Sequence, residues 1–599
     1  MSRSYVTDRI QRLRHALQAR GVHAYVALTA DPHLSEYLPE HWQGRQWLSG
    51  FAGSAGTLVV TDSFAGLWTD SRYWEQAETD LAGTGIALMR AGAPEVPTPA
   101  QWVAQHLHQG QSVNIDGQVL SVQSHRQWHD TLRDTGIDLL TGFDTLADIW
   151  SDRPPLPAGT VFPHEPPFAC RTRAQNLAQV RAAMQARQAQ WLWLSSLDDI
   201  AWLLNLRGND VPFNPVFLAH ALVGLTGVQL FVDPAKLPEN CRRALAADGV
   251  VVQPYGQAAQ ALAGLAETDT LWVDPARTTV GTLQAAQSVK KTEGLNPSQR
   301  LKACKNAAEI HNVRQTMAHD GAALCEFFAW FEQALAAGER LTELTVDEMI
   351  TAARARQPHF VSPSFGTIAA FNANGAMPHY HATEQSHAVI QGDGLLLIDS
   401  GGQYLGGTTD ITRVVPVGQV TAEQKADYTA VLKGMIALAT AVFPEGMAAP
   451  VLDAIARAPL WQVGADYGHG TGHGVGYFMN VHEGPQSIAY RASHSADMAM
   501  REGMITSDEP GLYRPGRWGI RIENLVLAVP AQETEFGQFL AFETLTLCPI
   551  DTRCIEPGAL TAAEQAWLNA YHAVVRERLL PLVAGRARDW LLLRTEPLH

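Results

Sequence analysis

A nine-residue segment, GHGTGHGVG (468–476), has a glycine at every second position and carries His469 and His473 between the glycines. Five glycines in a helix would cost on the order of 5 kcal/mol relative to alanine, so we expect an extended conformation. Alternate side chains of an extended chain share a face, which would direct His469, Thr471 and His473 the same way. The bare glycine face would admit another backbone or a ligand. A flexible loop with incidental histidines is the alternative, but the strict alternation and the nearby His482 argue against it.

Two aspartates on an earlier segment are candidate partners for these histidines. Asp399 ends the apolar run LLLID, and Asp410 follows it in GGTTD, with Gly406 and Gly407 available to turn the chain between them. The two strands of one hairpin would bring both carboxylates together. Each aspartate alone is more commonly a turn residue or a solvated charge, so the pair by itself is weak evidence for a site.

Two glutamates further along the chain extend the acidic set. Glu509 lies in SDEPGLY, between a strand-like stretch and a Pro-Gly turn. In WGIRIENLVLAV, alternation places Arg521 and Glu523 on one face of a strand and Ile520 and Ile522 on the other. A cross-strand ion pair on a solvated sheet would explain Arg521 and Glu523 equally well. Four acids gathered in one core, however, would repel one another and resist ionisation, whereas divalent cations would neutralise them.

The type of metal follows from the donor atoms, which are four carboxylates and one imidazole. Such an oxygen-rich set favours hard ions such as Mn²⁺ over the nitrogen- and sulfur-rich shells of structural zinc. Carboxylates can also bridge two ions about 3.5–4 Å apart that share a hydroxide nucleophile. We therefore predict two divalent cations, Mn²⁺ first, with Zn²⁺ or Co²⁺ as alternatives. The candidate ligands are Asp399, Asp410, His473, Glu509 and Glu523.

Composition limits the class of protein and its partners. A chain of 599 residues with 46% hydrophobic content can form about three to five domains. Its formal net charge of -16 repels phosphate backbones and anionic lipid surfaces, so nucleic acid is not an expected partner. Six cysteines without a C-x-x-C pair are typical of reduced thiols. Since no secretion signal or bilayer-spanning stretch is evident, we expect a cytoplasmic protein without membrane contact.

The first half of the chain contains a weak internal duplication. Residues 21–75 and 190–233 each combine short apolar strands, an acidic turn and an aromatic-rich helix, which is typical of a repeated α/β unit. The six prolines of residues 151–168 favour an extended connector between the copies. A long stretch of helix formers then begins near residue 300. The predicted domains are 1–155, 156–299 and 300–599.

Taken in order, the candidate ligands and their motifs resemble the pita-bread metallopeptidases of family M24, and specifically the three-domain Xaa-Pro aminopeptidases (aminopeptidase P). The resemblance covers nearly the whole chain. It implies the α/β (α+β) class, with two creatinase-like N-terminal α/β domains followed by a C-terminal pita-bread catalytic domain. The segments that carry it are SEYL, WLSGFAGSAGT, WTDSRY, LDDIAWLLNLRGND, NPVF, IDSGGQYLGGTTDITR, GHGTGHGVG, SDEPGLY and GIRIENL.

The resemblance also implies a mechanism. Asp410 and Glu523 would bridge both ions, Asp399 would bind one of them, and His473 and Glu509 would bind the other. In the family, a metal-bound hydroxide attacks the carbonyl of the first residue, and the carboxylate that matches Glu509 accepts its proton. The proline imide nitrogen leaves. The implied function is a Xaa-Pro aminopeptidase acting on peptides with proline in the second position.

Four further side chains receive roles through the same match. His379, His469 and His482 resemble the substrate-side histidines of the family, which position the peptide and hydrogen-bond its carbonyl oxygen as that oxygen gains charge. Arg521 would orient the acids, with a structural ion pair as the alternative. His381, in an H-x-H pair with His379, is interpreted as an ordinary surface or loop histidine.

The fold leaves three alternative functions. An X-Pro dipeptidase (prolidase) with the same metal centre would cleave only dipeptides. A non-catalytic pita-bread peptide-binding module, a known fate of the fold in histone chaperones, would have lost ligands, and no ligand position departs from the pattern here. A creatinase-like hydrolase would work without metal. The family also implies a homodimer, and N-terminal domains that cover the mouth of the active site.

Overall fold

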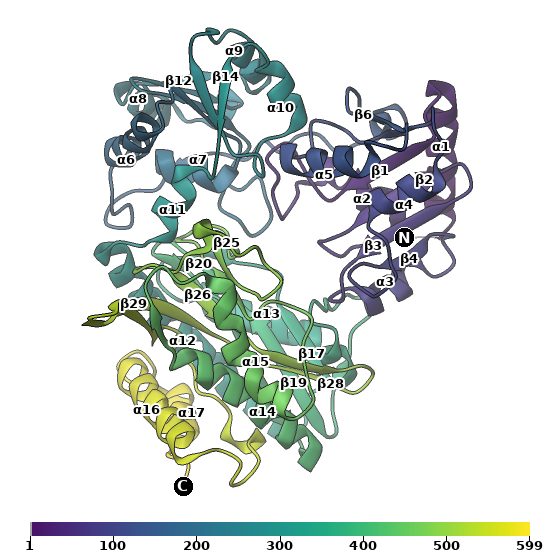
Figure 1. Ribbon diagram of the computed structural model, residues 1–599. Coiled ribbons are helices and arrows are strands. Elements are labelled where there is room, and N and C mark those ends of the chain that lie inside the picture. The colour runs from purple at the N-terminus through teal and green to yellow at the C-terminus, as the bar shows by residue number, and fades with distance from the viewer. Residues whose placement is uncertain (1–2) are drawn as a thin grey trace. The chain divides into compact units, whose positions relative to one another are not determined.

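The computed structural model describes residues 3–599, which divide into two compact units. The first unit comprises the residues up to Glu165 and Arg171–Ser298, and the second comprises Pro166–Cys170 and Gln299–His599 (Figure 1). Among residues 3–599, no helix combines the length and apolarity that a bilayer crossing requires.

The first unit contains two six-stranded sheets with one topology. The strand orders are β4-β3-β2-β1-β5-β6 and β12-β11-β10-β8-β13-β14, and corresponding neighbours pair in the same sense in both sheets. The predicted duplication is therefore confirmed. The strands are β1 (Ala24–Leu28), β2 (Thr57–Thr61), β3 (Ala65–Thr69), β4 (Ala87–Arg90), β5 (Ser112–Asn114), β6 (Asp138–Leu140), β8 (Trp191–Leu194), β10 (His220–Gly224), β11 (Val228–Phe231), β12 (Val250–Gln253), β13 (Thr270–Val273) and β14 (Lys290–Glu293).

Both faces of the first sheet are covered. Leu58 and Val60 of β2 belong to the core that includes α1, whereas Val59 packs on the other face with residues of α4 and α5. This alternation follows from the two-residue period of a strand. The helices around the two sheets include α1 (Arg3–Arg20), α4 (Pro99–His106), α5 (Val122–Leu132), α6 (Arg173–Ala186), α8 (Glu239–Ala247), α9 (Ala258–Ala263) and α10 (Val280–Ala285).

The second unit surrounds its strands with long helices. Their apolar faces form one large core with the sheet β17-β19-β22. The longest helix begins after Asn306, which caps it. The Asn306 side chain accepts a hydrogen bond from the Glu309 N–H, and the Glu309 carboxylate accepts one from the Asn306 N–H. The helices are α12 (Ala307–Ala336), α13 (Glu343–Ala355), α14 (Ala422–Ala439), α15 (Asp453–Gln462), α16 (Ala562–Leu579) and α17 (Gly585–Arg594).

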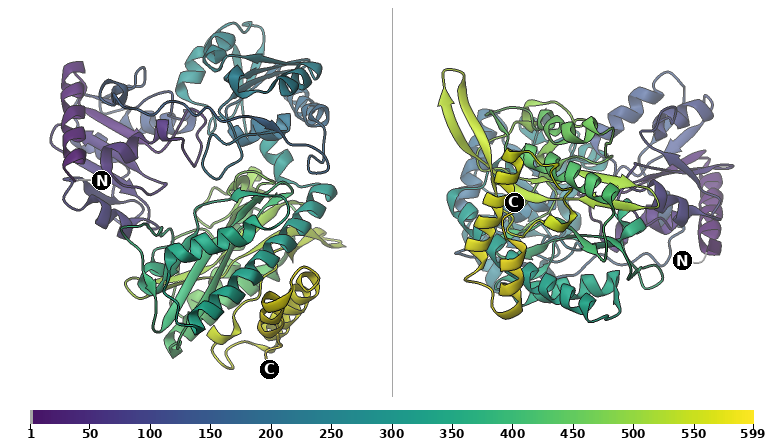
Figure 2. Two further views of the ribbon diagram at one scale, coloured as in Figure 1. Left: turned by 180° about the vertical axis from the view of Figure 1, so that it is seen from behind. Right: turned by 90° about the horizontal axis from the view of Figure 1, so that it is seen from below.

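The strands of the second unit form one six-stranded sheet, two three-stranded sheets and two two-stranded ribbons. The six-stranded sheet has the order β23-β30-β29-β26-β24-β25, and its β29–β30 hairpin projects from the unit (Figure 2). The strands are β15 (Leu341–Thr342), β16 (Phe360–Pro363), β17 (Ile368–Phe371), β18 (Val389–Ile390), β19 (Gly394–Ser400), β20 (Gly402–Tyr404), β21 (Gly407–Thr408), β22 (Ile411–Val417), β23 (Val442–Pro444), β24 (Gly472–Gly474), β25 (Glu483–Ile488), β26 (Ile505–Asp508), β27 (Gly511–Arg514), β28 (Trp518–Arg521), β29 (Asn524–Thr534) and β30 (Gly537–Thr544).

Candidate metal centre

The two aspartates come from neighbouring strands of the three-stranded sheet. β19 and β22 are antiparallel, with Asp399 opposite Thr412, and Asp410 directly precedes β22. Between them, β20 and β21 form a short hairpin that turns at Leu405 and Gly406. The predicted hairpin arrangement of the two acids is therefore confirmed.

The other three candidate ligands come from the six-stranded sheet. His473 is the central residue of β24, Glu509 directly follows β26, and Glu523 directly precedes β29. β26 pairs with both β24 and β29, so the three side chains start from adjacent strands. The backbone N–H of Glu523 also donates to the carbonyl of Thr412, which joins this sheet to β22.

The glycines around His473 allow β24 to lie very close to both of its neighbours. A Cβ at Gly472 would stand 1.9 Å from the carbonyl oxygen of Ser507, and one at Gly474 would stand 2.3 Å from that of Glu483. The predicted close approach of another backbone is confirmed. The predicted extended conformation forms a strand at Gly472–Gly474, whereas the chain bends at Gly468, His469 and Thr471.

Thr471 does not join the two histidines in the way the alternation predicts. Its hydroxyl is buried and donates to Asp453, and it also lies in hydrogen-bond contact with the hydroxyl of Tyr467. The bends before β24 redirect the segment, so the two-residue period cannot be extended from His473 back to His469.

His473 lies between two carboxylates. Its Nε2 is 3.5 Å from Asp410 Oδ2 and 3.4 Å from Glu509 Oε1, while its Nδ1 is 2.9 Å from the carbonyl oxygen of Gly474. Because the carbonyl can only accept, Nδ1 carries the proton of a neutral ring and Nε2 presents a lone pair. Although burial lowers it, the hydrogen bond to Asp410 and the charge of Glu509 raise the pKa of His473 to about 9. Nε2 thus requires a positive charge, either a proton or a cation.

Two of the acids have oxygens with no hydrogen-bond partner among residues 3–599. Asp399 Oδ1 and Glu523 Oε1 are both buried and unpaired. Burial raises the pKa of Asp399 to about 6 and that of Glu509 to about 7. Burial and the charge of Asp410 raise the pKa of Glu523 well above its usual value. These acids therefore lack the positive charge that would hold all of them ionised.

A divalent cation fits this deficit. Ligand atoms of Asp410, His473 and Glu523 lie within 4.8 Å of one another, near enough to share one ion. A cation would accept the lone pair of His473 Nε2 and would give the unpaired carboxylate oxygens a partner. Glu509 and Asp399 extend the same cluster, since Glu509 lies against His473 and the charge of Asp399 raises the pKa of Glu523.

Arg521 lies beside the acids and is buried. Its Nη2 donates to Asp399 Oδ2 at 2.5 Å, and its Nε donates to the Thr412 hydroxyl at 3.1 Å. That hydroxyl donates in turn to Glu523 Oε2 at 2.7 Å. One guanidinium and one threonine therefore orient two of the candidate ligands. No feature of the sequence identifies Thr412 as part of the site; its position opposite Asp399 is known from the strand pairing.

Tyr513 connects Arg521 to His469 and is a residue that sequence reasoning misses. Its hydroxyl oxygen lies 2.7 Å from Arg521 Nη1 and 2.7 Å from His469 Nε2. His469 Nδ1 is 2.8 Å from the Gly470 carbonyl, so Nδ1 donates there and Nε2 accepts from Tyr513. Burial raises the pKa of Tyr513 to about 12, which keeps the hydroxyl a donor. Tyr513 stands within SDEPGLY, but an aromatic residue in a short strand is usually core packing.

The remaining predicted histidines occupy different positions. The ring of His482 is half-buried and meets that of His473 edge-to-face, with centroids 4.2 Å apart. His379 is half-buried in the loop that follows η5 (Asn372–Ala376), and η5 packs against β28, the strand of Arg521. His381 is exposed.

Buried ion pairs anchor the chain next to His482. Glu483 Oε1 lies 2.5 Å from Lys305 Nζ, and Glu483 Oε2 lies 3.3 Å from Lys302 Nζ. Lys305 also donates to the carbonyl of Val475 at 2.7 Å, just beyond β24. Sequence reasoning misses these lysines because their partners are remote in the chain.

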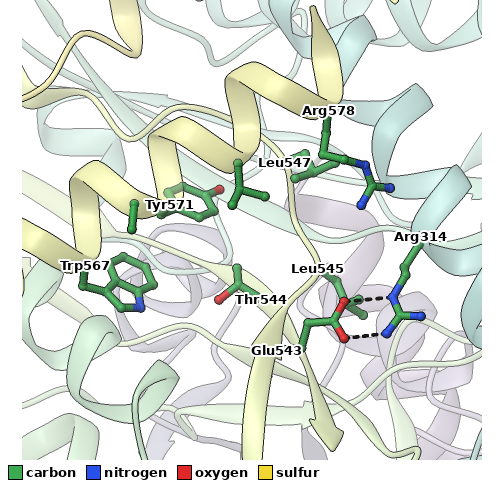
Figure 3. A pocket seen from close by; sticks show the side chains of 10 residues that line it. Arg314, Glu543, Thr544, Leu545, Leu547, Trp567, Tyr571 and Arg578 are labelled. Atoms are coloured by element: carbon green, nitrogen blue, oxygen red, sulfur yellow. Dashed lines mark hydrogen bonds and ion pairs between the residues drawn. The ribbon is translucent and has the colours of Figure 1, made fainter. Parts of the chain in front are cut away.

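A pocket of about 290 Å³ lies elsewhere in the second unit, between β30, α12 and α16 (Figure 3). At one end of it, Arg314 donates from Nε and Nη2 to the two carboxylate oxygens of Glu543, and Trp567 and Tyr571 of α16 form an aromatic wall. None of the five candidate ligands lines this pocket, so it is not part of the metal centre. Its lining residues are Arg314, Glu543, Thr544, Leu545, Leu547, Trp567, Ala570, Tyr571, Val574 and Arg578.

Comparison with known families agrees with this fold and site. Residues 311–530 match metallopeptidase family M24, and residues 538–598 match the C-terminal region of peptidase M24. Residues 9–146 and 152–309 each match the creatinase/prolidase N-terminal domain. The fold and the site therefore define an M24 metallopeptidase with two creatinase-type N-terminal domains and a pita-bread catalytic domain.

Full-length relatives narrow the class. Aminopeptidase P2 of Arabidopsis thaliana is 38% identical over 96% of this chain and 86% of its own. The probable Xaa-Pro aminopeptidase P of Paracoccidioides brasiliensis (strain Pb03) is 37% identical over 99% of both chains. The crystal structure of X-prolyl aminopeptidase from Caenorhabditis elegans, described as a cytosolic enzyme with a di-nuclear active site, has 31% identity and a TM-score of 0.94 over 100% of both chains. The chain belongs to the Xaa-Pro aminopeptidase P family, and the predicted family and fold class are confirmed.

Proposed function

We propose that this chain hydrolyses the bond between the first residue and proline in peptides with proline in the second position. The observation that carries the proposal is the convergence of His473 with carboxylates whose buried oxygens lack a partner. The full-length similarity to Xaa-Pro aminopeptidases supports the same reaction.

The proposed ligand set holds two divalent cations. Asp399, Asp410, His473, Glu509 and Glu523 would hold them through carboxylate oxygens and the Nε2 of His473. The relative from Caenorhabditis elegans is described as having a di-nuclear active site, which supports two ions. The oxygen-rich donor set favours Mn²⁺. Bound cations would supply Lewis-acid chemistry, polarising the scissile carbonyl and lowering the pKa of water.

Among the acids, Glu509 is the proposed proton acceptor. Its side chain is 18% exposed, whereas Glu523 is 1% exposed, so water can reach Glu509 but not Glu523. The Ser507 hydroxyl donates to Glu509 Oε1 at 3.2 Å and orients the carboxylate. Glu509 would take a proton from the attacking water and return it toward the departing proline nitrogen.

The proposed substrate-side residues are His379, His469 and His482. His482 meets the ring of His473 edge-to-face, which places its imidazole beside the candidate ligands. Both ring nitrogens of His469 are engaged in this structure, so contact between its Nε2 and a substrate requires the hydrogen bond to Tyr513 to open. The proline nitrogen has no N–H, so the site need not provide an acceptor for it.

Partners and location belong to the same proposal. The Caenorhabditis elegans relative is described as cytosolic, and we propose the cytosol for this chain as well. A homodimer is proposed by analogy with the family. The acidic net charge of -16 supports peptide substrates over nucleic acid.

The test combines metal analysis with substrates of increasing length. Enzyme loaded with Mn²⁺ is expected to hold two ions per chain and to release the first residue from tripeptides and longer Xaa-Pro peptides. Cleavage restricted to Xaa-Pro dipeptides would assign the prolidase reaction to the same centre. Metal binding without cleavage of either substrate would favour a peptide-binding module.

A further inference from the structure

A buried carboxylate makes several hydrogen bonds to the loop that carries His379. The loop runs from the end of β17 to the start of β18, and Glu343, the first residue of α13, is 0% exposed beneath it. Among residues 3–599, Glu343 has no ion-pair partner. Its position at a helix N-terminus favours the negative charge.

Glu343 accepts from both ends of the loop and from its middle. Oε1 accepts from the Phe371 N–H at 2.7 Å and from Asn374 Nδ2 at 2.9 Å. Oε2 accepts from the Tyr380 hydroxyl at 2.8 Å and from the Ala388 N–H at 2.6 Å. Hydrogen bonds to a carboxylate are roughly twice as strong as those between neutral groups, so four of them restrain the loop strongly.

The opposite side of the loop is fixed by main-chain packing. A Cβ at Gly519 of β28 would stand 1.6 Å from the carbonyl oxygen of Gly375 in η5, so the two backbones lie in direct contact. β28 ends in Arg521, which donates to Asp399. The loop is thus held between Glu343 on one side and the strand that serves the metal centre on the other.

We propose that Glu343 is a positioning residue that sets the place of His379 through Tyr380. Tyr380 is the neighbour of His379 and is buried, so the bond from its hydroxyl to Glu343 fixes the backbone that orients the imidazole. The catalytic part of this inference rests on the proposed function. The structural part, that the bond holds the loop, does not depend on it.

The decisive variant is Tyr380→Phe, which keeps the aromatic ring and removes the donor to Glu343 together with the contacts of that hydroxyl with Asn374 and the Ser386 carbonyl, all within the loop system. In metal-loaded full-length enzyme, we expect kcat on a Xaa-Pro tripeptide to fall by about tenfold with bound metal unchanged. Combined with His379→Ala, the same change is expected to add less than about twofold, because its effect passes through His379. Glu343→Gln places an amide donor opposite other donors. It is expected to lower kcat more than Tyr380→Phe does, and this loss should also nearly disappear in the His379→Ala background.

Tyr404→Phe is the matched control, because the Tyr404 hydroxyl also donates to a buried carboxylate, Asp320, at 2.9 Å. It is expected to lower thermal stability as Tyr380→Phe does, but any change in kcat should be the same with and without His379. Hydrogen exchange of residues 372–388 supplies a readout independent of catalysis. Exchange there should rise in Tyr380→Phe and remain unchanged in Tyr404→Phe.

Several results would overturn the inference. Equal losses from Tyr380→Phe with and without His379, unchanged exchange in residues 372–388, or full activity of His379→Ala would each do so. If the wild-type enzyme cleaves no Xaa-Pro peptide, the proposed function fails, while the exchange measurement still decides whether the bond from Tyr380 to Glu343 holds the loop.

Discussion

Each unit of the molecule contains a cluster of histidines, and the two clusters differ in their surroundings. In the first unit, the rings of His33 and His220 stack with centroids 4.5 Å apart. His33 Nδ1 donates to the Ser195 carbonyl and its Nε2 accepts from the Tyr255 hydroxyl, both at 2.9 Å. A neutral imidazole satisfies both contacts. Burial lowers the pKa of both histidines.

In the second unit, His473 faces two carboxylates and has the opposite pKa shift. Two oxygens of the neighbouring acids, Asp399 Oδ1 and Glu523 Oε1, have no hydrogen-bond partner among residues 3–599, and one neutral imidazole cannot satisfy all of these groups. Burial of a histidine therefore does not by itself identify a functional site. The missing positive charge distinguishes the candidate metal centre from a structural histidine network. Variants that alter charge should therefore affect metal content and activity in the second cluster but not in the first.

The largest effect is expected from Asp410→Ala. Loss of this carboxylate, which lies within 4.8 Å of two other candidate ligands, should abolish metal binding and lower kcat/KM by at least about 10³-fold. Metal content by mass spectrometry and peptide cleavage check this together. Asp589→Ala, at an exposed position on α17, is the matched control and should change neither quantity. If Asp410→Ala retained both ions, the carboxylate of Asp410 would not be required for metal binding, and the proposed difference between the two clusters would be wrong.

His482→Ala should separate catalysis from metal binding. The ring contacts His473 but is not a proposed ligand, so we expect kcat to fall by about 10²-fold while metal content stays at the wild-type value. Steady-state kinetics at saturating Mn²⁺ and metal analysis of the same sample measure both. Loss of metal in this variant would make His482 part of the ligand set.

Tyr513→Phe tests whether the hydrogen bonds around the centre sharpen its geometry. The variant leaves Arg521 Nη1 and His469 Nε2 without their shared partner, so about a tenfold fall in kcat/KM is expected. Metal affinity should weaken only slightly, because Arg521 keeps its bond to Asp399. Wild-type kinetics in Tyr513→Phe would show that the connection has no role in turnover.

The smallest effect is expected from His33 in the first unit, on the pH dependence of the free energy of unfolding. Because the pKa of His33 is lowered on folding, the unfolded chain binds more protons, and stability should decline as the pH falls below about 6.5. Burial outweighs the opposing charges of Asp31 and Asp210. His33→Gln should flatten the decline by up to about 1.4 kcal/mol per pH unit, measured by urea unfolding between pH 7 and pH 5. An unchanged slope would show that His33 does not titrate with unfolding.

The sequence predicts most of the fold because its signals are local. The repeated α/β rhythm predicts two sheets of one topology, and the glycine pair after Asp399 predicts the hairpin that brings Asp410 close to it. The glycine alternation predicts close backbone approach around His473. The same alternation fails before Gly472, because bends in the tertiary structure override a two-residue period.

The contacts that hold the centre in place are harder to predict from sequence. Thr412, Tyr513 and Glu343 act through partners remote in the chain, and their residue types are common in strands and at helix starts. Only the three-dimensional structure places Thr412 and Tyr513 beside Arg521, and Glu343 beneath the loop of His379. Local pattern therefore identifies the candidate ligands, whereas their orientation depends on long-range hydrogen bonds.

The direct contact of β24 with its neighbours restricts how this catalytic domain can change. At Gly472 and Gly474, even one methyl group would collide with a main-chain oxygen, and Ser507 and Glu483 could not move aside without shifting their own strands. The position of the His473 imidazole is therefore set by the backbone packing of the sheet. Substitution of Gly472 or Gly474 is therefore expected to displace this strand, and with it the ring of the candidate ligand His473.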